Sequence, residues 1–287
     1  MRYFHALVEG EQRLVATDED RTFDLTAANG TVKSFTDLAR TAAITDRSID
    51  DITDGLLENA EPTDVSLEAA SLPVEADEIW AAGVTYQISE EAREAESGMP
   101  EMYLDVYESD RPEVFFKATP NRTVGPDEAV GIRADSDWDV PEPELGVVLY
   151  DGEPVGYTIG NDMSSRSIEG ANPLYLPQAK VYDRCCSIGP CIVSTDTIED
   201  PHDLTISMAI KRDGAIVYDG KTSTSEMDRT CDELVSYYTR HNAVPEVSVL
   251  LTGTSLVPPD DFTLSAGDTV TIDIESVGTL SNPVVTV

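Results

Sequence analysis

Short hydrophobic runs separated by Gly, Pro and Asp dominate the chain from Leu72 onward. The runs are rich in Val, Ile, Thr and Tyr, residues that favour strands. They lie at 113–117, 145–150, 155–159, 204–210, 215–218, 247–251 and 269–274. A series of short runs without regularly alternating helical segments predicts a β-rich domain rather than a doubly wound α/β fold.

Two segments of this region have a helical pattern instead. Ser225–His241 begins with a residue suited to an N-cap, and its apolar positions recur at helical spacing. The stripe comprises Met227, Cys231, Leu234, Val235 and Tyr238. It predicts a helix packed on the sheet through this face. Ser89–Ser97 is short and highly charged, which indicates a second, surface helix.

Residues 1–70 have a different, more polar texture. Tyr3–Val8 and Arg13–Ala16 resemble strands, Ser34–Ala43 is weakly helical, and Asp50–Ala70 is acidic and often interrupted. We therefore expect a small N-terminal α+β domain at 1–70 and a larger domain at 71–287. The fold class that follows is α+β with mostly β structure.

Charge restricts the possible partners. The 287 residues carry 55 Asp and Glu against 19 Lys and Arg, a net charge of −36, which opposes binding to nucleic acid. The acids are dispersed and only five lysines occur, as in cytosolic proteins of extreme halophiles, where molar salt screens repulsion. The alternative is an acidic protein of a cytosol with little salt, in which its own carboxylates would repel one another much more strongly.

The hydropathy pattern and the cysteines indicate the cellular compartment in which the protein is expected. No apolar run approaches the roughly 18 residues that a bilayer crossing needs, and the N-terminus lacks a signal-peptide pattern. The four cysteines lack zinc-site spacing. We expect a cytoplasmic protein without a membrane partner, whose cysteines are buried free thiols.

The most specific chemical pattern is a pair of glutamates entering a strand. Glu142 and Glu144 are two positions apart, so a strand presents both carboxylates on one side. Asp162 ends another predicted strand, and pairing of the two strands would bring three oxygen donors together. Such a set suits Mg²⁺ or Mn²⁺. In so acidic a chain, however, two nearby glutamates are often simply solvated.

The context of these acids resembles the fumarylacetoacetate hydrolase family, over about residues 73–287. The similar segments are 141–149, 156–166, Lys180, 189–193, 266–270 and 278–284. The resemblance implies a mixed β-roll catalytic domain and a Mg²⁺ ion held by Glu142, Glu144 and Asp162. It also implies a 2-oxo acid substrate, whose carboxylate and keto oxygens chelate the metal.

Departures from the family pattern narrow the expected reaction. Hydrolases of the family carry a His and, three residues later, a Glu that activate water, but this chain has Ser89 and Ala92 there. Ser167 and Ser255 also depart from the common Asp and Pro. Segments 84–86, 111–122, 172–180 and 185–186 instead resemble the family's 2-keto-3-deoxypentonate dehydratases.

This resemblance implies roles for individual residues. Lys180 and Glu113 would share the acid–base work, and their two roles could be exchanged. We expect a nearby dication to lower the pKa of Lys180 and an apolar surrounding to raise that of Glu113. The implied substrate-binding residues are Tyr86, Arg166, Gln178 and Thr254.

The expected function is a Mg²⁺-dependent dehydratase (Mn²⁺ being an alternative metal). It would convert a 2-keto-3-deoxypentonate of the arabinonate or xylonate type to 2,5-dioxopentanoate in oxidative pentose degradation. We expect a homo-oligomer, either a dimer or a tetramer. An acylpyruvate hydrolase or oxaloacetate decarboxylase of the same family is one alternative. A catalytically silent binding protein on this fold is another.

Overall fold

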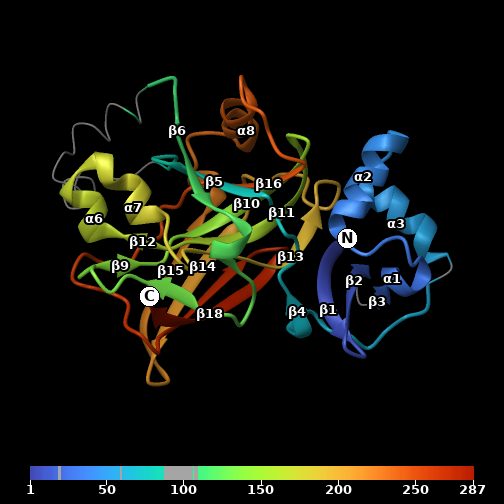
Figure 1. Cartoon of the computed structure of the whole chain (residues 1–287), viewed down its shortest axis with the longest axis horizontal. Coiled ribbons are helices and arrows are strands. Elements are labelled where there is room, and N and C mark those ends of the chain that lie inside the picture. Colours follow the sequence, from blue (N-terminus) through green and yellow to red (C-terminus); the bar gives the residue numbers. More distant parts are fainter. Residues whose placement is uncertain (19–20, 59, 87–105, 107–108) are drawn as a thin grey trace.

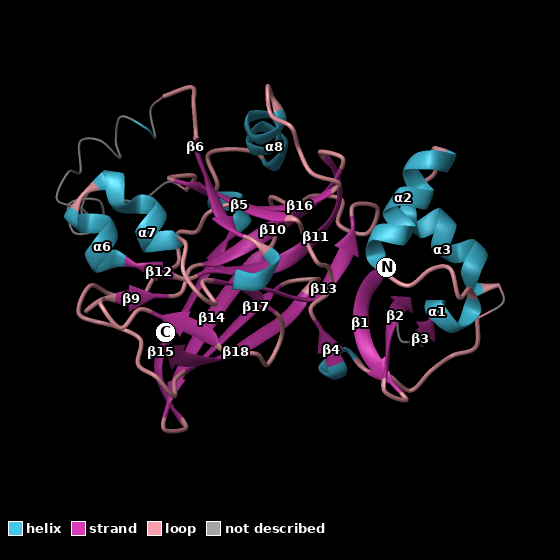
Figure 2. Ribbon diagram, in the orientation of Figure 1, coloured by secondary structure: helices cyan, strands magenta, loops and turns pink. Residues whose placement is uncertain are grey.

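The computed structural model describes residues 1–18, 21–58, 60–86, 106 and 109–287. Two large sheets form its centre (Figures 1 and 2). The first sheet has the order β3-β2-β1-β13-β11-β10-β16-β5-β6, with β4 added to β1 and β7 to β13. The second has the order β15-β14-β17-β18-β8, and β9 and β12 form a small pair. The predicted α+β class with mostly β structure is confirmed.

The strands of the first sheet are β1 (Arg2–Val8), β2 (Glu11–Asp18), β3 (Arg21–Asp24), β4 (Ala70–Ser71), β5 (Glu78–Gly83), β6 (Glu113–Ala118), β7 (Thr123–Val124), β10 (Pro143–Tyr150), β11 (Glu153–Asp162), β13 (Cys186–Ser194) and β16 (Val247–Leu251). Those of the others are β8 (Val130–Ile132), β9 (Asp139–Val140), β12 (Ser164–Ser165), β14 (Thr205–Arg212), β15 (Ala215–Ser223), β17 (Thr269–Ile274) and β18 (Gly278–Thr286). The α-helices are α1 (Leu25–Ala28), α2 (Phe35–Thr45), α3 (Ile49–Leu57), α6 (Arg166–Ala171), α7 (Leu176–Lys180) and α8 (Cys231–Thr239). Single 3₁₀ turns lie at Leu67–Ala69, Pro120–Arg122, Pro173–Tyr175 and Thr224–Glu226.

The central strands are buried on both faces. Every residue of β10 and of β13 is buried, as are the last seven residues of β11. This explains why their sequences are nearly continuous apolar runs instead of alternating patterns. Each of the seven hydrophobic runs coincides with a strand of the structure, except that Leu204 lies one residue before β14. The rigid centre made by these strands carries the polar residues at their ends.

The N-terminal elements continue the first sheet. β1 pairs antiparallel with β13 at Arg2↔Val193 and Tyr3↔Ile192, while β2 and β3 extend outward with α1–α3 beside them (Figure 1). The predicted helix is α2, which Ser34 caps in a capping box with Asp37. The division into domains at residue 70 remains a prediction.

Five of the α-helices in the described residues differ from the sequence prediction, among them the short α1, which was not predicted. α3 occupies part of the segment expected to be interrupted, because Ser48 caps it and acids in its first turn favour the helix dipole. α6 and α7 were not predicted at all. The predicted helix Ser89–Ser97 lies outside the described residues.

The start of α8 is a correction to the predicted helix at Ser225–His241. Thr230, not Ser225, is the N-cap, and its side chain accepts a hydrogen bond from the Glu233 amide. Met227 therefore precedes the helix, whereas the other four residues of the apolar stripe are buried on it as expected. All four cysteines are buried free thiols, which confirms that prediction. Within the described ranges, no helix has the length and apolar character to cross a membrane.

Candidate active site

The three predicted acids converge at one end of the β10–β11 pair. The strands are antiparallel with Glu144 opposite Gly160, and the Asp162 amide donates to the Glu142 carbonyl at 2.9 Å. One carboxylate oxygen from each acid lies within 4.8 Å of the others. All three side chains are buried, Glu144 and Asp162 to 1% exposure. The expected convergence of Glu142, Glu144 and Asp162 is confirmed.

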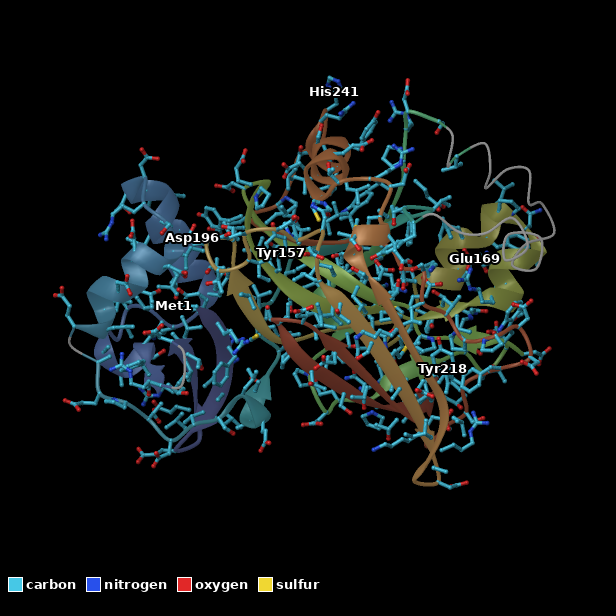
Figure 3. All side chains as sticks on the ribbon, turned by 180° about the vertical axis from the view of Figure 1, so that it is seen from behind. Met1, Tyr157, Glu169, Asp196, Tyr218 and His241 are labelled. Carbon is cyan, nitrogen blue, oxygen red and sulfur yellow. The ribbon has the colours of Figure 1, made fainter. Side chains whose placement is uncertain are left out.

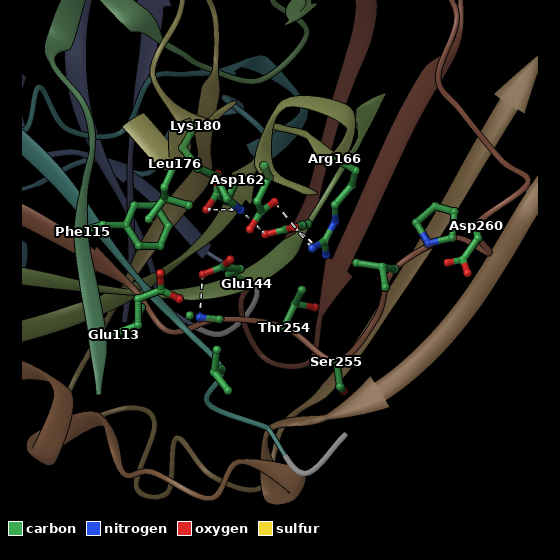
Figure 4. Close-up of a pocket in the computed structure, with 18 of the residues that line it drawn as sticks. Glu113, Phe115, Glu144, Asp162, Arg166, Leu176, Lys180, Thr254, Ser255 and Asp260 are labelled. Atoms are coloured by element: carbon green, nitrogen blue, oxygen red, sulfur yellow. Dashed lines mark hydrogen bonds and ion pairs between the residues drawn. The ribbon is translucent and has the colours of Figure 1, made fainter. Parts of the chain in front are cut away.

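Two cations line the same site (Figure 4). Lys180, at the end of α7, places Nζ 2.7 Å from Glu142 Oε2, 3.2 Å from Asp162 Oδ2 and 2.6 Å from Ser164 Oγ. Arg166, at the start of α6, forms an ion pair with Glu142 Oε1 at 2.9 Å. Short helices α6 and α7 thus bring both cations over the strand ends.

The protein groups around Lys180 favour its charged form. Burial lowers the pKa of Lys180, but Asp162 and Glu142 outweigh this effect and raise it well above the usual value. These carboxylates stabilise the ammonium more than burial disfavours it. The predicted lowering requires a bound dication and stays a prediction.

Glu144 has a different environment from the other two acids. Its Oε2 accepts a hydrogen bond from the Gly253 amide at 2.6 Å, and none of the ion pairs of the described residues includes it. Gly253 has φ +85°, and a Cβ there would lie 2.1 Å from Thr85 Oγ1, so the position requires glycine. Burial, Asp162 and Glu142 raise the pKa of Glu144 well above its usual value.

This donor set fits a hard divalent cation. The three carboxylates are buried together, and the charge of Glu144 is poorly compensated, so the site needs a further positive charge among them. Mg²⁺ supplies such a charge and prefers carboxylate oxygens as ligands. Glu142, Glu144 and Asp162 would hold the ion, as the sequence predicted.

A cavity of about 440 Å³ opens beside the triad and is lined by both polar and apolar residues. Its wall includes Glu113, Phe115, Leu176, Thr254, Ser255 and Asp260 (Figure 4). Glu169 also lines it. Of the predicted residues, Glu113, Arg166, Lys180 and Thr254 line it. Burial, followed by the charge of Glu169, raises the pKa of Glu113 to about 7, in the predicted direction.

Two predicted binding residues are not among those that line the cavity. Tyr86 is completely buried, next to the segment outside the described residues. Gln178 is exposed on α7, and its carbonyl accepts a hydrogen bond from Arg133. A role for either in binding the substrate remains a prediction.

Besides Asp260, the structure adds two charged residues that sequence reasoning missed. Lys117 on β6 is fully buried and pairs with Asp162 Oδ1 at 2.5 Å. A lysine within the apolar run of β6, in a chain with five lysines, was the available signal. Glu169 on α6 lines the cavity 3.6 Å from the Arg166 guanidinium, and nothing in the sequence distinguished it from other acids. Figure 3 shows Glu169 far from Met1, on the α6 side of the molecule.

Comparison with known proteins gives consistent matches. A family model described as the C-terminal part of fumarylacetoacetate hydrolase matches residues 78–285. The chain is 63% identical, over all of both chains, to a probable 2-keto-3-deoxyxylonate dehydratase of Haloferax volcanii. It is 44% identical to a 2-dehydro-3-deoxy-D-arabinonate dehydratase of Saccharolobus solfataricus, over 74% of this chain and 73% of that protein.

A solved structure is similar over the whole chain. It is a 2-keto-3-deoxy-D-arabinonate dehydratase complexed with magnesium and 2,5-dioxopentanoate. The TM-score is 0.84 and the sequence identity 33%, with 100% of this chain and 99% of that chain covered.

Proposed function

The chain belongs to the fumarylacetoacetate hydrolase family, and we propose that it is a Mg²⁺-dependent dehydratase of 2-keto-3-deoxypentonates. Its substrate is a 2-oxo acid of the arabinonate or xylonate type, and its product is 2,5-dioxopentanoate. The observation that carries this proposal is the buried carboxylate triad with Lys180 directly against it. The full-length similarity to dehydratases supports the same reaction.

We assign the proton transfers to Lys180 and Glu113, whose two roles could be exchanged. When bound, Mg²⁺ supplies a Lewis acid that makes the C3–H bond beside the 2-keto group more acidic. Lys180, whose Nζ faces the triad, then removes the C3 proton as the neutral amine, because the carboxylates that raise its pKa are offset by the dication. Glu113, with a pKa raised to about 7, donates a proton to the C4 hydroxyl as it leaves as water. Further proton shifts then give the aldehyde.

The wall of the cavity disfavours oxaloacetate as the substrate. Away from the triad it carries the carboxyl groups of Glu113, Glu169 and Asp260. The cations on the described part of the wall, Arg166 and Lys180, are both paired with Glu142. A second substrate carboxylate would meet like charge there, whereas the neutral hydroxyls of a sugar acid can donate hydrogen bonds to acids.

The hydrolase alternative lacks its water-activating pair. Ser89 and Ala92 occupy the positions of the family's His and Glu, and both lie outside the described residues. Without that pair, attack by water lacks the base that hydrolases of the family use, while loss of the C4 hydroxyl requires only Lys180 and Glu113. The intact triad and Lys180 argue against a silent binding protein.

The remaining expectations belong to the same proposal. The enzyme acts in the cytoplasm as a homo-oligomer, with residues 1–70 as an accessory domain and 71–287 as the catalytic domain. Its dispersed acidic charge suits a cytoplasm of high salt.

A substrate comparison tests the reaction. The protein is incubated in molar KCl with Mg²⁺ and 2-keto-3-deoxyarabinonate, 2-keto-3-deoxyxylonate, an acylpyruvate or oxaloacetate, and the products are identified by mass. We expect a 2-keto-3-deoxypentonate to have the highest kcat/KM. A higher value for the acylpyruvate or for oxaloacetate would overturn the assignment.

Variants test the role of Lys180. Lys180→Ala should lose about 10²–10⁴-fold in kcat, the range of general acid–base catalysis. Lys211→Ala, which removes an exposed lysine on β14, is the matched control and should keep full activity. Equal activity of both variants would exclude Lys180 from proton transfer.

A further inference from the structure

We propose that Lys117 is a positioning residue of the metal site: it holds Asp162 so that Oδ2 alone is available to the ion. The proposal rests on the Mg²⁺ site of the proposed function but not on the identity of the reaction, because its readout is metal binding.

The contacts of Lys117 leave its ammonium group no freedom. Its side chain is completely buried. Nζ pairs with Asp162 Oδ1 at 2.5 Å and donates hydrogen bonds to the carbonyls of Met163 at 2.8 Å and of Lys180 at 2.5 Å. Two of the three N–H donors of the ammonium bond to these carbonyls, and its charge is paired with Oδ1. Moving it would leave a buried charge without partners, which is costly.

These contacts join three separate elements around the site. Lys117 comes from β6, Asp162 ends β11, and the Lys180 carbonyl ends α7. The carbonyl of Met163 immediately follows Asp162, so both the side chain and the backbone of this segment are fixed by one group. Lys117 thereby sets the position of a metal ligand relative to Lys180.

The two oxygens of Asp162 consequently differ. Oδ1 is in ion-pair contact with Lys117, whereas Oδ2 accepts a hydrogen bond from Lys180 Nζ at 3.2 Å, and this ammonium also contacts Glu142. Oδ2 is therefore the oxygen that faces the other carboxylates. Without Lys117, Asp162 could turn or offer both oxygens, and the donor set would lose its fixed geometry.

A purely electrostatic role makes the opposite prediction. A fixed positive charge beside Asp162 repels a dication, so removing only the charge would tighten metal binding. Removing a positioning contact weakens it, and loss of a group that orients a metal ligand typically costs about 10–100-fold in affinity. The direction of the change in Kd separates the two roles.

The experiment compares Mn²⁺ binding to the full chain by calorimetry in molar KCl. Lys117→Met keeps the length of the side chain and removes the ammonium, and Lys211→Met is the matched control. We expect Lys117→Met to raise the Kd at least about 10-fold, with a changed Mn²⁺ EPR spectrum, while the control matches the wild type. An unchanged or lower Kd for folded Lys117→Met would overturn the proposal.

The wild-type protein gives an independent test in case Lys117→Met does not fold. In its crystal structure with Mn²⁺, Asp162 should bind the ion through Oδ2 alone, with Oδ1 still paired to Lys117. Ligation through Oδ1 or through both oxygens contradicts the proposal. Mn²⁺ binding with this geometry but no dehydration would refute the proposed reaction and leave the role of Lys117 standing.

Discussion

Replacing Glu144 by Gln tests whether the triad is built for a cation. Oxygens of Glu144, Glu142 and Asp162 lie within 4.8 Å of each other. At this separation and an effective dielectric constant of about 20, each pair of like charges repels by roughly 3.5 kcal/mol. Lys180, Arg166 and Lys117 offset this repulsion at the other two acids, but no described ion pair includes Glu144.

We therefore expect opposite effects with and without metal. In a chelator, Glu144→Gln should be at least as stable as the wild type, because it removes a repelled charge and keeps an acceptor for the Gly253 amide. With Mg²⁺ at 100 times its Kd, the wild type should gain about 2.7 kcal/mol. For a chain of this size that is about 5 °C in Tm. The variant should gain almost nothing and lose its activity.

Thermal unfolding followed by circular dichroism in molar KCl, with EDTA or with Mg²⁺, measures both effects. Glu153→Gln, at an exposed position of β11, is the matched control for the change in net charge and should retain the full Mg²⁺ shift. A Glu144→Gln variant that keeps the shift, or that melts far below the wild type in EDTA, would refute the reasoning.

Four further predictions concern the cavity and the surface. The protonated form of Glu113 is the proton donor, and its pKa is raised to about 7, so kcat should fall as the pH rises through about 7. A pH–rate profile without this descending limb would exclude Glu113 as the proton donor. Glu169→Gln removes a charge that raises the pKa of Glu113, so the limb should move to lower pH, and a fixed limb would contradict the link. The same variant should bind oxaloacetate more tightly as an inhibitor, and an unchanged inhibition constant would show that Glu169 does not repel dicarboxylates. Lowering KCl from about 1 M to about 0.1 M lengthens the Debye length from about 3 to about 10 Å, so with a net charge of −36 the Tm should fall; equal melting at both concentrations would contradict adaptation to salt.

The parts of the fold that the sequence predicted depend on local patterns. Apolar runs located the strands, and the two-residue spacing of Glu142 and Glu144 predicted a shared face. The helix boundaries failed where local signals compete: acids near Asp50 indicated a break, but after Ser48 they stabilise the first turn of α3. Similarly, Thr230 rather than Ser225 begins α8, since either residue suits an N-cap.

The site residues that the sequence did not predict are brought to the site by long-range contacts. Lys117 meets Asp162 across 45 positions of the chain, because β6 and α7 come together beside the end of β11. The identity of Glu169 as a cavity residue likewise depends on how α6 covers the strand ends. The spacing of residues along the sequence cannot predict such a contact. It depends on how the strands and helices are arranged in space, whereas spacing describes only one helix or strand at a time.

The placement of the triad on a single hairpin has a consequence for the order of assembly during folding. Glu142, Glu144 and Asp162 are contributed by β10 and β11 and their immediate flank, whereas Glu113 and Gly253 come from distant strands or loops. Short loops close at low entropic cost, and hairpins form in about 1–10 μs. The three carboxylates can therefore be brought together early in folding. Glu113 and the positioning residue Lys117 both wait for β6 to dock, so a refolding chain gathers its metal ligands before it gains full metal affinity and catalysis.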